Sequence, residues 1–243
     1  MTLLPRIAVG TVQSDAEIQV VLWALMDLLE RSGLHVQTFS SQARLEWRDA
    51  AVSITGQGRR HLDSWLMQPD VCAELFRHAT ESADVGVVEG AYDVATGWQQ
   101  TGGSLDRLCE WLDLPQLAIV DASTLDPCCP PNMPSGLAGI LLDNVIDAEH
   151  LCRLQTELAA LHGVPVLGSM EQVSHLRGAV ANLPGNESPT VDLCRALGAE
   201  LEGRIRIDSL VEIATRREFV EVHGDVFRHR MLSQPLNVAV AYD

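Results

Sequence analysis

The chain contains no lysine. All 17 basic residues are arginines, and 33 acidic residues outnumber them, which gives a formal net charge of -16. A field of that sign repels nucleic acid and anionic membranes, so we expect neither as a partner. Any mechanism that requires a lysine is excluded as well.

Other absences narrow the class of protein. No apolar run is long enough to cross a bilayer. The N-terminus MTLLPRIAVG lacks the basic region and long apolar stretch of a secretory signal, so we expect a cytoplasmic protein. Six cysteines show neither a C-x-x-C pair nor metal-ligand spacing, and we interpret them as reduced thiols, most of them in the core: Cys72, Cys109, Cys128, Cys129, Cys152 and Cys194.

The remaining composition is that of a soluble globular protein, with 243 residues, 47% hydrophobic and 21% charged. Short β-branched runs alternate with longer amphipathic stretches, which predicts an α/β fold with a doubly wound, mostly parallel sheet and helices on both faces. Strands are expected at 6–10, 34–39, 84–89, 116–121, 139–142 and 164–167, and helices at 18–32, 63–80, 105–112 and 147–161. Residues 40–61 show no clear period and are expected to form an irregular excursion.

The segment TLDPCCPPNMP, residues 124–134, holds four prolines and predicts a rigid loop. Its vicinal cysteines could form a redox or metal device, but without any partner spacing we favour plain loop thiols.

Two segments invite a nucleotide-site interpretation. The loop Gly10-Thr11-Val12-Gln13-Ser14-Asp15-Ala16-Glu17 joins the first strand to a helix, where a phosphate-binding loop would sit in such a sheet. Glu89 ends a buried strand, where a magnesium-binding carboxylate is often found. A surface carboxylate without a ligand is the alternative interpretation of Glu89, and position alone leaves both open.

Here the residues carry a resemblance. The chain resembles the N-terminal synthetase domain of the cobyrinate a,c-diamide synthase family, grouped with cobyric acid synthase and dethiobiotin synthetase. The matching segments are RIAVGT (6–11), TGQGRRHLDSWLM (55–67), ADVGVVEGAYDVATG (83–97), GGSLDRLCEWLDLPQLAIVDAS (102–123), SGLAGILLDNV (135–145) and GVPVLGSM (163–170). The resemblance implies a sheet of the P-loop NTPase type. It also implies that ATP phosphorylates a corrin carboxylate, which ammonia from glutamine then converts to an amide.

The sequence departs from that family at the nucleotide site. The family loop reads approximately GTSSGVGKTT, so Glu17 replaces the lysine and Ile18 the hydroxyl residue that would hold magnesium. A carboxylate about 4 Å from a phosphate costs roughly 4 kcal/mol at a surface-like dielectric. QARLEWR (42–48) replaces an aspartate-rich segment, and Asp143 replaces an asparagine that recognises adenine. An aspartate can accept a hydrogen bond from adenine but cannot donate one.

We therefore expect a degenerate nucleotide site, formed by Gly10, Thr11, Gln13, Ser14, Glu17 and Asp143, and no bound cofactor. Ser14 and Glu17 fit an S-x-x-E capping box, which would satisfy the amides at the helix start internally. Glu89 remains the one candidate for catalysis or for a metal. If the chain is instead an active enzyme, ATP and magnesium are its cofactors.

Arg59, Arg60, His61 and Asp63 are substrate-binding candidates, because paired arginines suit the carboxylates of a corrin. The alternative is an ordinary helix N-terminus capped by Asp63.

The resemblance also implies the domain organisation. We expect a synthetase-like domain at 1–200, a helical segment and linker at 201–235, and at 236–243 the first strand of a truncated or absent glutaminase domain. The expected partners are a second copy of the chain, in a homodimer, and a glutaminase domain in cis or in trans. The sequence leaves two functions open: a binding domain that does not hydrolyse ATP, and an active amidoligase domain.

Overall fold

The protein forms one seven-stranded sheet with the strand order β3-β2-β4-β1-β5-β6-β7, and every strand pairing in it is parallel. This computed structural model describes residues 4–14, 16–43, 49–96, 103–126, 130–184, 187–219, 224 and 226–227. The strands are β1 (Arg6–Thr11), β2 (Val36–Ser40), β3 (Arg60–His61), β4 (Val85–Ala91), β5 (Gln116–Asp121), β6 (Leu137–Val145) and β7 (Val166–Glu171).

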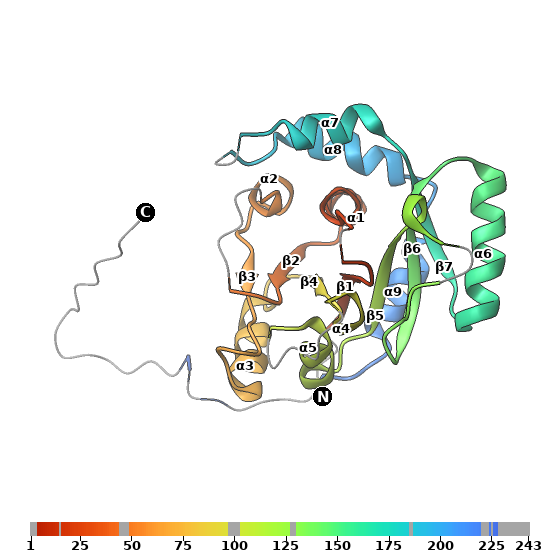
Figure 1. Cartoon of the computed structure of the whole chain (residues 1–243). Helices are drawn as coiled ribbons and strands as arrows, with labels where there is room; N and C mark the ends of the chain where they lie inside the picture. Colours follow the sequence, from red (N-terminus) through yellow and green to blue (C-terminus); the bar gives the residue numbers. More distant parts are fainter. Residues whose placement is uncertain are drawn as a thin grey trace, which may run out of the picture.

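Helices cover both faces of the sheet (Figure 1). They are α1 (Gln19–Arg31), α2 (Ala51–Thr55), α3 (Pro69–Ala79), α4 (Asp93–Thr96), α5 (Leu105–Leu112), α6 (Ala148–His162), α7 (Ser174–Ala181), α8 (Val191–Leu201) and α9 (Ile207–Thr215), with a 3-10 turn at Ala122–Thr124. One apolar core lies under α1, α2, α7, α8 and α9, and a second lies under α3, α5 and α6. The doubly wound α/β prediction is confirmed.

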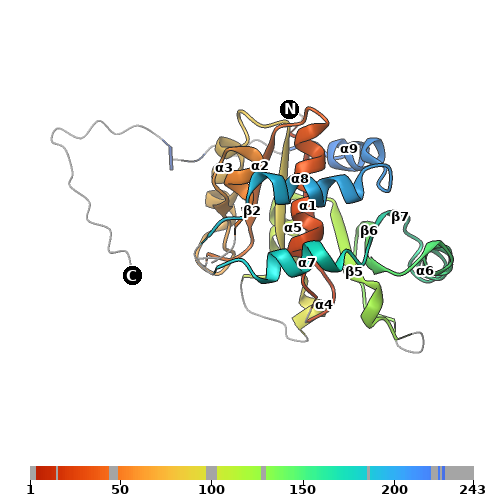
Figure 2. The ribbon, with the colours of Figure 1, turned by 90° about the horizontal axis from the view of Figure 1, so that it is seen from above.

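The most deeply buried helix is α1, which packs between the sheet and α8 (Figure 2). Ten consecutive residues from Val20 to Leu29 are buried, including the completely buried Trp23. A helix that is covered on nearly all sides must be apolar on nearly all sides, which explains its run of Val, Leu and Met.

Most predicted elements are confirmed within one to three residues, and α5 and β5 are confirmed at both ends. The helix predicted at 63–80 is wrong in its first turns, because α3 begins at Pro69 in the first helical position, which suits a residue without an N–H. The excursion at 40–61 contains α2 and β3, and α7 and α8 were not predicted. The strand expected at 236–243 and the cysteine pair at 128–129 lie outside the described residues.

The topology marks one crevice. The chain leaves β1 through α1 on one face, and it leaves the adjacent β4 through α5 on the opposite face. In open parallel sheets ligands bind outside the carboxyl ends of the strands at such a switch point. The candidate site is therefore the edge formed by the ends of β1, β4, β5 and β6. In the part of the chain described, no helix combines the length and apolar character needed to span a membrane.

Candidate functional site

The Gln13 side chain connects the loop after β1 to the end of β5 through hydrogen bonds. The Gln13 side-chain Nε2 donates to the Asp121 carbonyl oxygen at 3.1 Å and to Thr124 Oγ1 at 2.8 Å, while its Oε1 accepts from the Asp121 amide at 2.7 Å. Thr11 Oγ1 accepts from the Gln13 amide at 3.0 Å. Two candidate nucleotide residues, Thr11 and Gln13, thus bond to the protein's own backbone.

Gly10 has a packing reason for lacking a side chain. A Cβ atom there would lie 2.8 Å from the carbonyl oxygen of Gly90 and 2.6 Å from Leu105 Cδ2. Real Cβ atoms do not approach backbone that closely, so a larger residue would push β1 away from β4 and α5. The close packing of the sheet accounts for Gly10 without a phosphate.

The predicted capping box is wrong. The helix begins at Gln19, with Ile18 as the N-cap and no side-chain bond capping it. The buried residues of α1 start at Val20, so the helix begins where its contact with the core begins and not at Ser14. Ser14 and Glu17 are exposed in the preceding loop.

Glu89, the candidate for catalysis or metal binding, is buried beside an arginine. Arg59 Nη1 forms an ion pair with Glu89 Oε1, and Arg59 Nη2 contacts Asp49 Oδ1 at 3.0 Å. The Arg59 side chain is only 3% exposed. Arg59, Glu89 and Asp49 thus form a buried trio in which the two carboxylates compensate the charge of the guanidinium. Arg59 is therefore not exposed to a substrate, in contrast to the expectation from the sequence.

The other three substrate candidates have different surroundings. Asp63 is buried and organises loops: its Oδ2 accepts from the Ala43 amide at 2.9 Å and its Oδ1 from the Trp65 amide at 2.8 Å. The alternative that Asp63 caps a helix is wrong, because α3 starts six residues later. His61 Nδ1 lies 3.1 Å from the Gln42 carbonyl oxygen, and Arg60 is exposed.

Asp143 lies in β6, two residues before the strand ends, and pairs directly with Asp121 at the end of β5. It forms an ion pair with Arg177 of α7, and its Oδ1 accepts from the Asn144 amide at 2.8 Å. Asn144 Nδ2 in turn donates to Asp121 Oδ1 at 3.0 Å. Burial raises the pKa of Asp143, the Arg177 guanidinium lowers it, and Asp121 adds a smaller upward shift. The net pKa is about 6. Arg177 therefore covers the carboxylate that the resemblance places at the adenine position.

Sequence reasoning missed the groups that complete this edge. Asp49, Asp121 and Arg177 come from a loop, a strand end and a helix that no motif connects with the first strand. Arg177 lies 34 residues from Asp143, and α7 was not predicted at all. No local pattern could have identified them.

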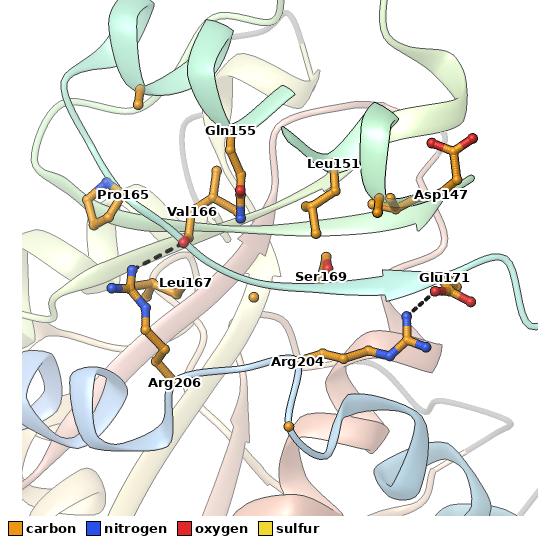
Figure 3. Close-up of a pocket in the computed structure, with 15 residues that line it drawn as sticks. Asp147, Leu151, Gln155, Pro165, Val166, Leu167, Ser169, Glu171, Arg204 and Arg206 are labelled. Carbon is orange, nitrogen blue, oxygen red and sulfur yellow. Dashed lines mark hydrogen bonds and ion pairs between the residues drawn. The ribbon is translucent and has the colours of Figure 1, made fainter. Parts of the chain in front are cut away.

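A separate cavity lies at the β7 edge of the sheet (Figure 3). This cavity of about 670 Å³ runs between α6, β7 and the segment that joins α8 to α9. Arg204 pairs with Glu171, and Arg206 donates to the Val166 carbonyl oxygen at 3.3 Å. Val145, the last residue of β6, lines this cavity, but no residue of β1, β4 or β5 does, so it is distinct from the crevice at the switch point.

The described residues contain no group of three or more His, Cys, Asp or Glu side chains placed to hold a metal ion. The described cysteines Cys72, Cys109, Cys152 and Cys194 are free thiols. Burial raises the pKa of Cys72 to about 12 and that of Cys194 to about 11, so both stay protonated at neutral pH.

Comparisons with known proteins confirm the resemblance. A curated cobyrinate a,c-diamide synthase from Methanosarcina barkeri is 24% identical over 221 residues, which cover 84% of this chain and 44% of the relative. Another from Magnetococcus marinus is 26% identical over 231 residues, covering 87% and 48%. The chain thus spans about half the length of the curated relatives it matches. No protein-family profile matches it.

Solved structures of similar arrangement include the MinD cell division protein of Aquifex aeolicus, with a TM-score of 0.46, 11% identity, and coverage of 80% of this chain and 97% of that one. Chloroplast FtsY from Physcomitrella patens gives a TM-score of 0.47, 12% identity, and coverage of 88% and 66%.

The buried ion pairs of Arg59 with Glu89 and Asp49 are expected to contribute to the stability of the fold. Arg59→Met should lower the free energy of unfolding by about 3–5 kcal/mol, because it leaves Glu89 buried without its cation. Urea denaturation measures the change. Arg107→Met, which removes an exposed pair with Glu110, is the control and should cost about 1 kcal/mol or less. Equal losses in the two variants would show that the trio is not a buried ion pair.

Asp143 predicts a pH dependence. Its folded pKa of about 6 exceeds the ordinary value of 3.8, so the stabilisation it gives is complete below about pH 4 and is lost as the pH rises through 6. The free energy of unfolding of the wild type should fall over that range by up to about 3 kcal/mol relative to Asp143→Asn. Denaturation of both proteins at a series of pH values tests this, and parallel curves would contradict it.

Proposed function

We propose, from its similarity to the cobyrinate a,c-diamide synthases, that this chain is a synthetase-like domain of the cobalamin-biosynthesis family that does not hydrolyse ATP. It keeps the sheet and the crevice of the family and acts by binding a ligand or a partner.

One observation carries the proposal: the polar groups at the crevice are bound to one another. Arg59 pairs with Glu89, Arg177 pairs with Asp143, and Gln13 bridges the loop after β1 to Asp121. A nucleotide and magnesium would have to break these contacts, and each broken ion pair leaves a buried charge behind.

The charges at the loop support the same conclusion. Phosphoryl transfer is catalysed mainly by positive charge and metal placed around the transferring group. Here the loop after β1 carries Asp15 and Glu17 and no basic residue, and Glu89 already contacts a guanidinium. The residues present do not fit magnesium and ATP.

The second candidate is an active ATP- and glutamine-dependent amidoligase domain. Its support is the order of the matching segments and the names of the curated relatives, which are cobyrinate a,c-diamide synthases. In this case Glu89 would bind magnesium, and Arg60 and His61 would face the corrin substrate. Arg59 would first have to leave Glu89.

Calorimetric titration of the purified chain with magnesium and ATP, up to millimolar concentration, separates the two functions. The first predicts no saturable heat, because the crevice groups are already paired. Saturable heat that disappears in Glu89→Gln would favour the amidoligase. The matched control is Glu81→Gln, which changes an exposed carboxylate two residues after α3.

A substitution in the loop gives a further prediction. Glu17→Lys alone should not produce ATP hydrolysis, because Ser14 and Ala16 still stand where the family loop has glycines, Ile18 still replaces the hydroxyl residue, and Glu89 stays paired with Arg59. Magnesium-dependent release of phosphate is the measurement. Release of phosphate by the Glu17→Lys variant would contradict the proposal that several residues of the nucleotide site differ from those that hydrolysis requires.

The homodimer and the glutaminase domain, in cis or in trans, are proposals of the same kind. They follow from the family resemblance.

A further inference from the structure

We propose that the cavity between α6, β7 and the segment joining α8 to α9, here called the β7 cavity, binds a small organic acid with an apolar body. The carboxylate of the acid binds at Arg206, and its apolar part lies between β7 and α6. The β7 cavity is separate from the crevice at the switch point, so the inference does not depend on the function proposed above.

An alternating segment places the cations of the β7 cavity. In Arg204-Ile205-Arg206 the isoleucine forms an antiparallel bridge with Gly168 and is buried in the core under α1 and α8. Successive residues of an extended segment point to opposite sides. Both arginines therefore point away from that core; they are exposed and line the cavity. The packing of one isoleucine thus holds two guanidinium groups on the same side of the segment.

Arg206 is the cation that is available to an anion. Its Nη2 donates to the Val166 carbonyl oxygen at 3.3 Å (Figure 3). Among the residues that the structure describes, no carboxylate lies within ion-pair distance of Arg206, whereas Arg204 is paired with Glu171. This is unusual in a chain with 33 acidic residues against 17 arginines. A guanidinium has five N–H donors in a planar fork that matches a carboxylate, so Arg206 can bind one in addition to the Val166 carbonyl.

The facing wall of the β7 cavity comes from α6. Residues at a spacing of three or four lie on one face of this helix and line the cavity, namely Ala148, Leu151, Gln155 and Ala159. Gln155 points from α6 toward Val166 (Figure 3). Its amide supplies a second donor for a carboxylate bound at that end. The alanines leave room between the helix and the strand.

The apolar part of the ligand has a place along β7. Val166 and Leu167 are buried residues of the two apolar cores that also line the β7 cavity, and Leu151 points toward β7 from α6 (Figure 3). Small-molecule sites usually measure about 300–1,000 Å³ and combine apolar walls with a few polar groups. The β7 cavity, of about 670 Å³, has this size and this character.

Negative charge at the other end of the β7 cavity sets the orientation of the ligand. Asp147 and Glu171 lie at the end away from Arg206 (Figure 3). Asp147 accepts from the His150 amide at 2.7 Å, and Glu171 is paired with Arg204. Because like charges repel, the carboxylate of the ligand is directed to the Arg206 end.

An NMR titration of the full ¹⁵N-labelled chain with sodium hexanoate at pH 7 tests the site. The amide signals of Gly168, Ser169 and Gly203, which line the β7 cavity, should shift saturably with a Kd of about 1 mM or lower. 1-Hexanol has the same apolar chain without the charge and should bind at least about tenfold more weakly, because it loses the bond to a charged group. Hexylamine should bind no better than 1-hexanol. Tighter binding of the amine or the alcohol than of the acid would overturn the proposal.

A substitution assigns the carboxylate to its cation. Arg206→Met keeps the apolar stem and removes the guanidinium, so the affinity for hexanoate should fall at least about tenfold, while that for 1-hexanol stays the same. The matched control is Arg60→Met, which changes an exposed arginine of β3 at the opposite edge of the sheet. It should leave both affinities unchanged. An equal Kd for hexanoate in the wild type and in Arg206→Met would contradict the assignment.

A second variant tests the cavity itself and keeps Arg206. Ala159→Trp introduces a large side chain into the β7 cavity from an exposed position of α6, so it should abolish the saturable shifts with both hexanoate and 1-hexanol. Thr156→Trp, at an exposed position of the same helix that does not line the cavity, is its control and should bind as the wild type does. Undiminished binding in Ala159→Trp would place the ligand elsewhere and overturn the proposal.

Discussion

The structure depends on neutralising charge inside a sheet that is covered on both faces. Among the described residues, the Arg6, Arg59 and Arg177 side chains are largely buried cations, and each is held by acceptors from distant parts of the chain. Because the chain has no lysine, every such role falls to a guanidinium, whose planar donors can bind several acceptors at once. These contacts connect β1 to the segment after α9, the segment between α2 and β3 to β4, and α7 to β6.

The periodicity of the sequence predicted the sheet because its signal is strong. Buried strands such as DVGVVE and QLAIVD are nearly uniformly apolar, and α5 carries its own N-cap, Ser104, which accepts from the Arg107 amide at 3.4 Å. The start of α3 was misplaced because the apolar residues Trp65 and Leu66, although they fit a helical period, are exposed in a turn. Periodicity alone cannot distinguish an apolar residue in the core from one on the surface.

The candidate site was only half predictable. Gly10, Thr11, Gln13, Glu89 and Asp143 do lie at the carboxyl ends of neighbouring strands, since a parallel sheet brings these ends together. Their partners could not be derived, because the Arg59 to Glu89 and Arg177 to Asp143 pairs depend on tertiary geometry over 30 and 34 residues. The capping box at Ser14 failed for a related reason: burial of α1 against the sheet, not a local motif, decides where the helix starts.

The segment joining α8 to α9 has a consequence for how copies of this protein can meet. The Ser169 amide donates to the Arg204 carbonyl oxygen at 3.3 Å, and the Arg206 amide donates to that of Leu167 at 3.1 Å, so the β7 edge already has a short antiparallel neighbour through the bridge of Gly168 with Ile205. The opposite edge, β3, is only two residues long. Neither edge offers a long open ladder to a strand from another molecule. Among the residues that the structure describes, pairing of this sheet with the sheet of another molecule is therefore disfavoured at both edges.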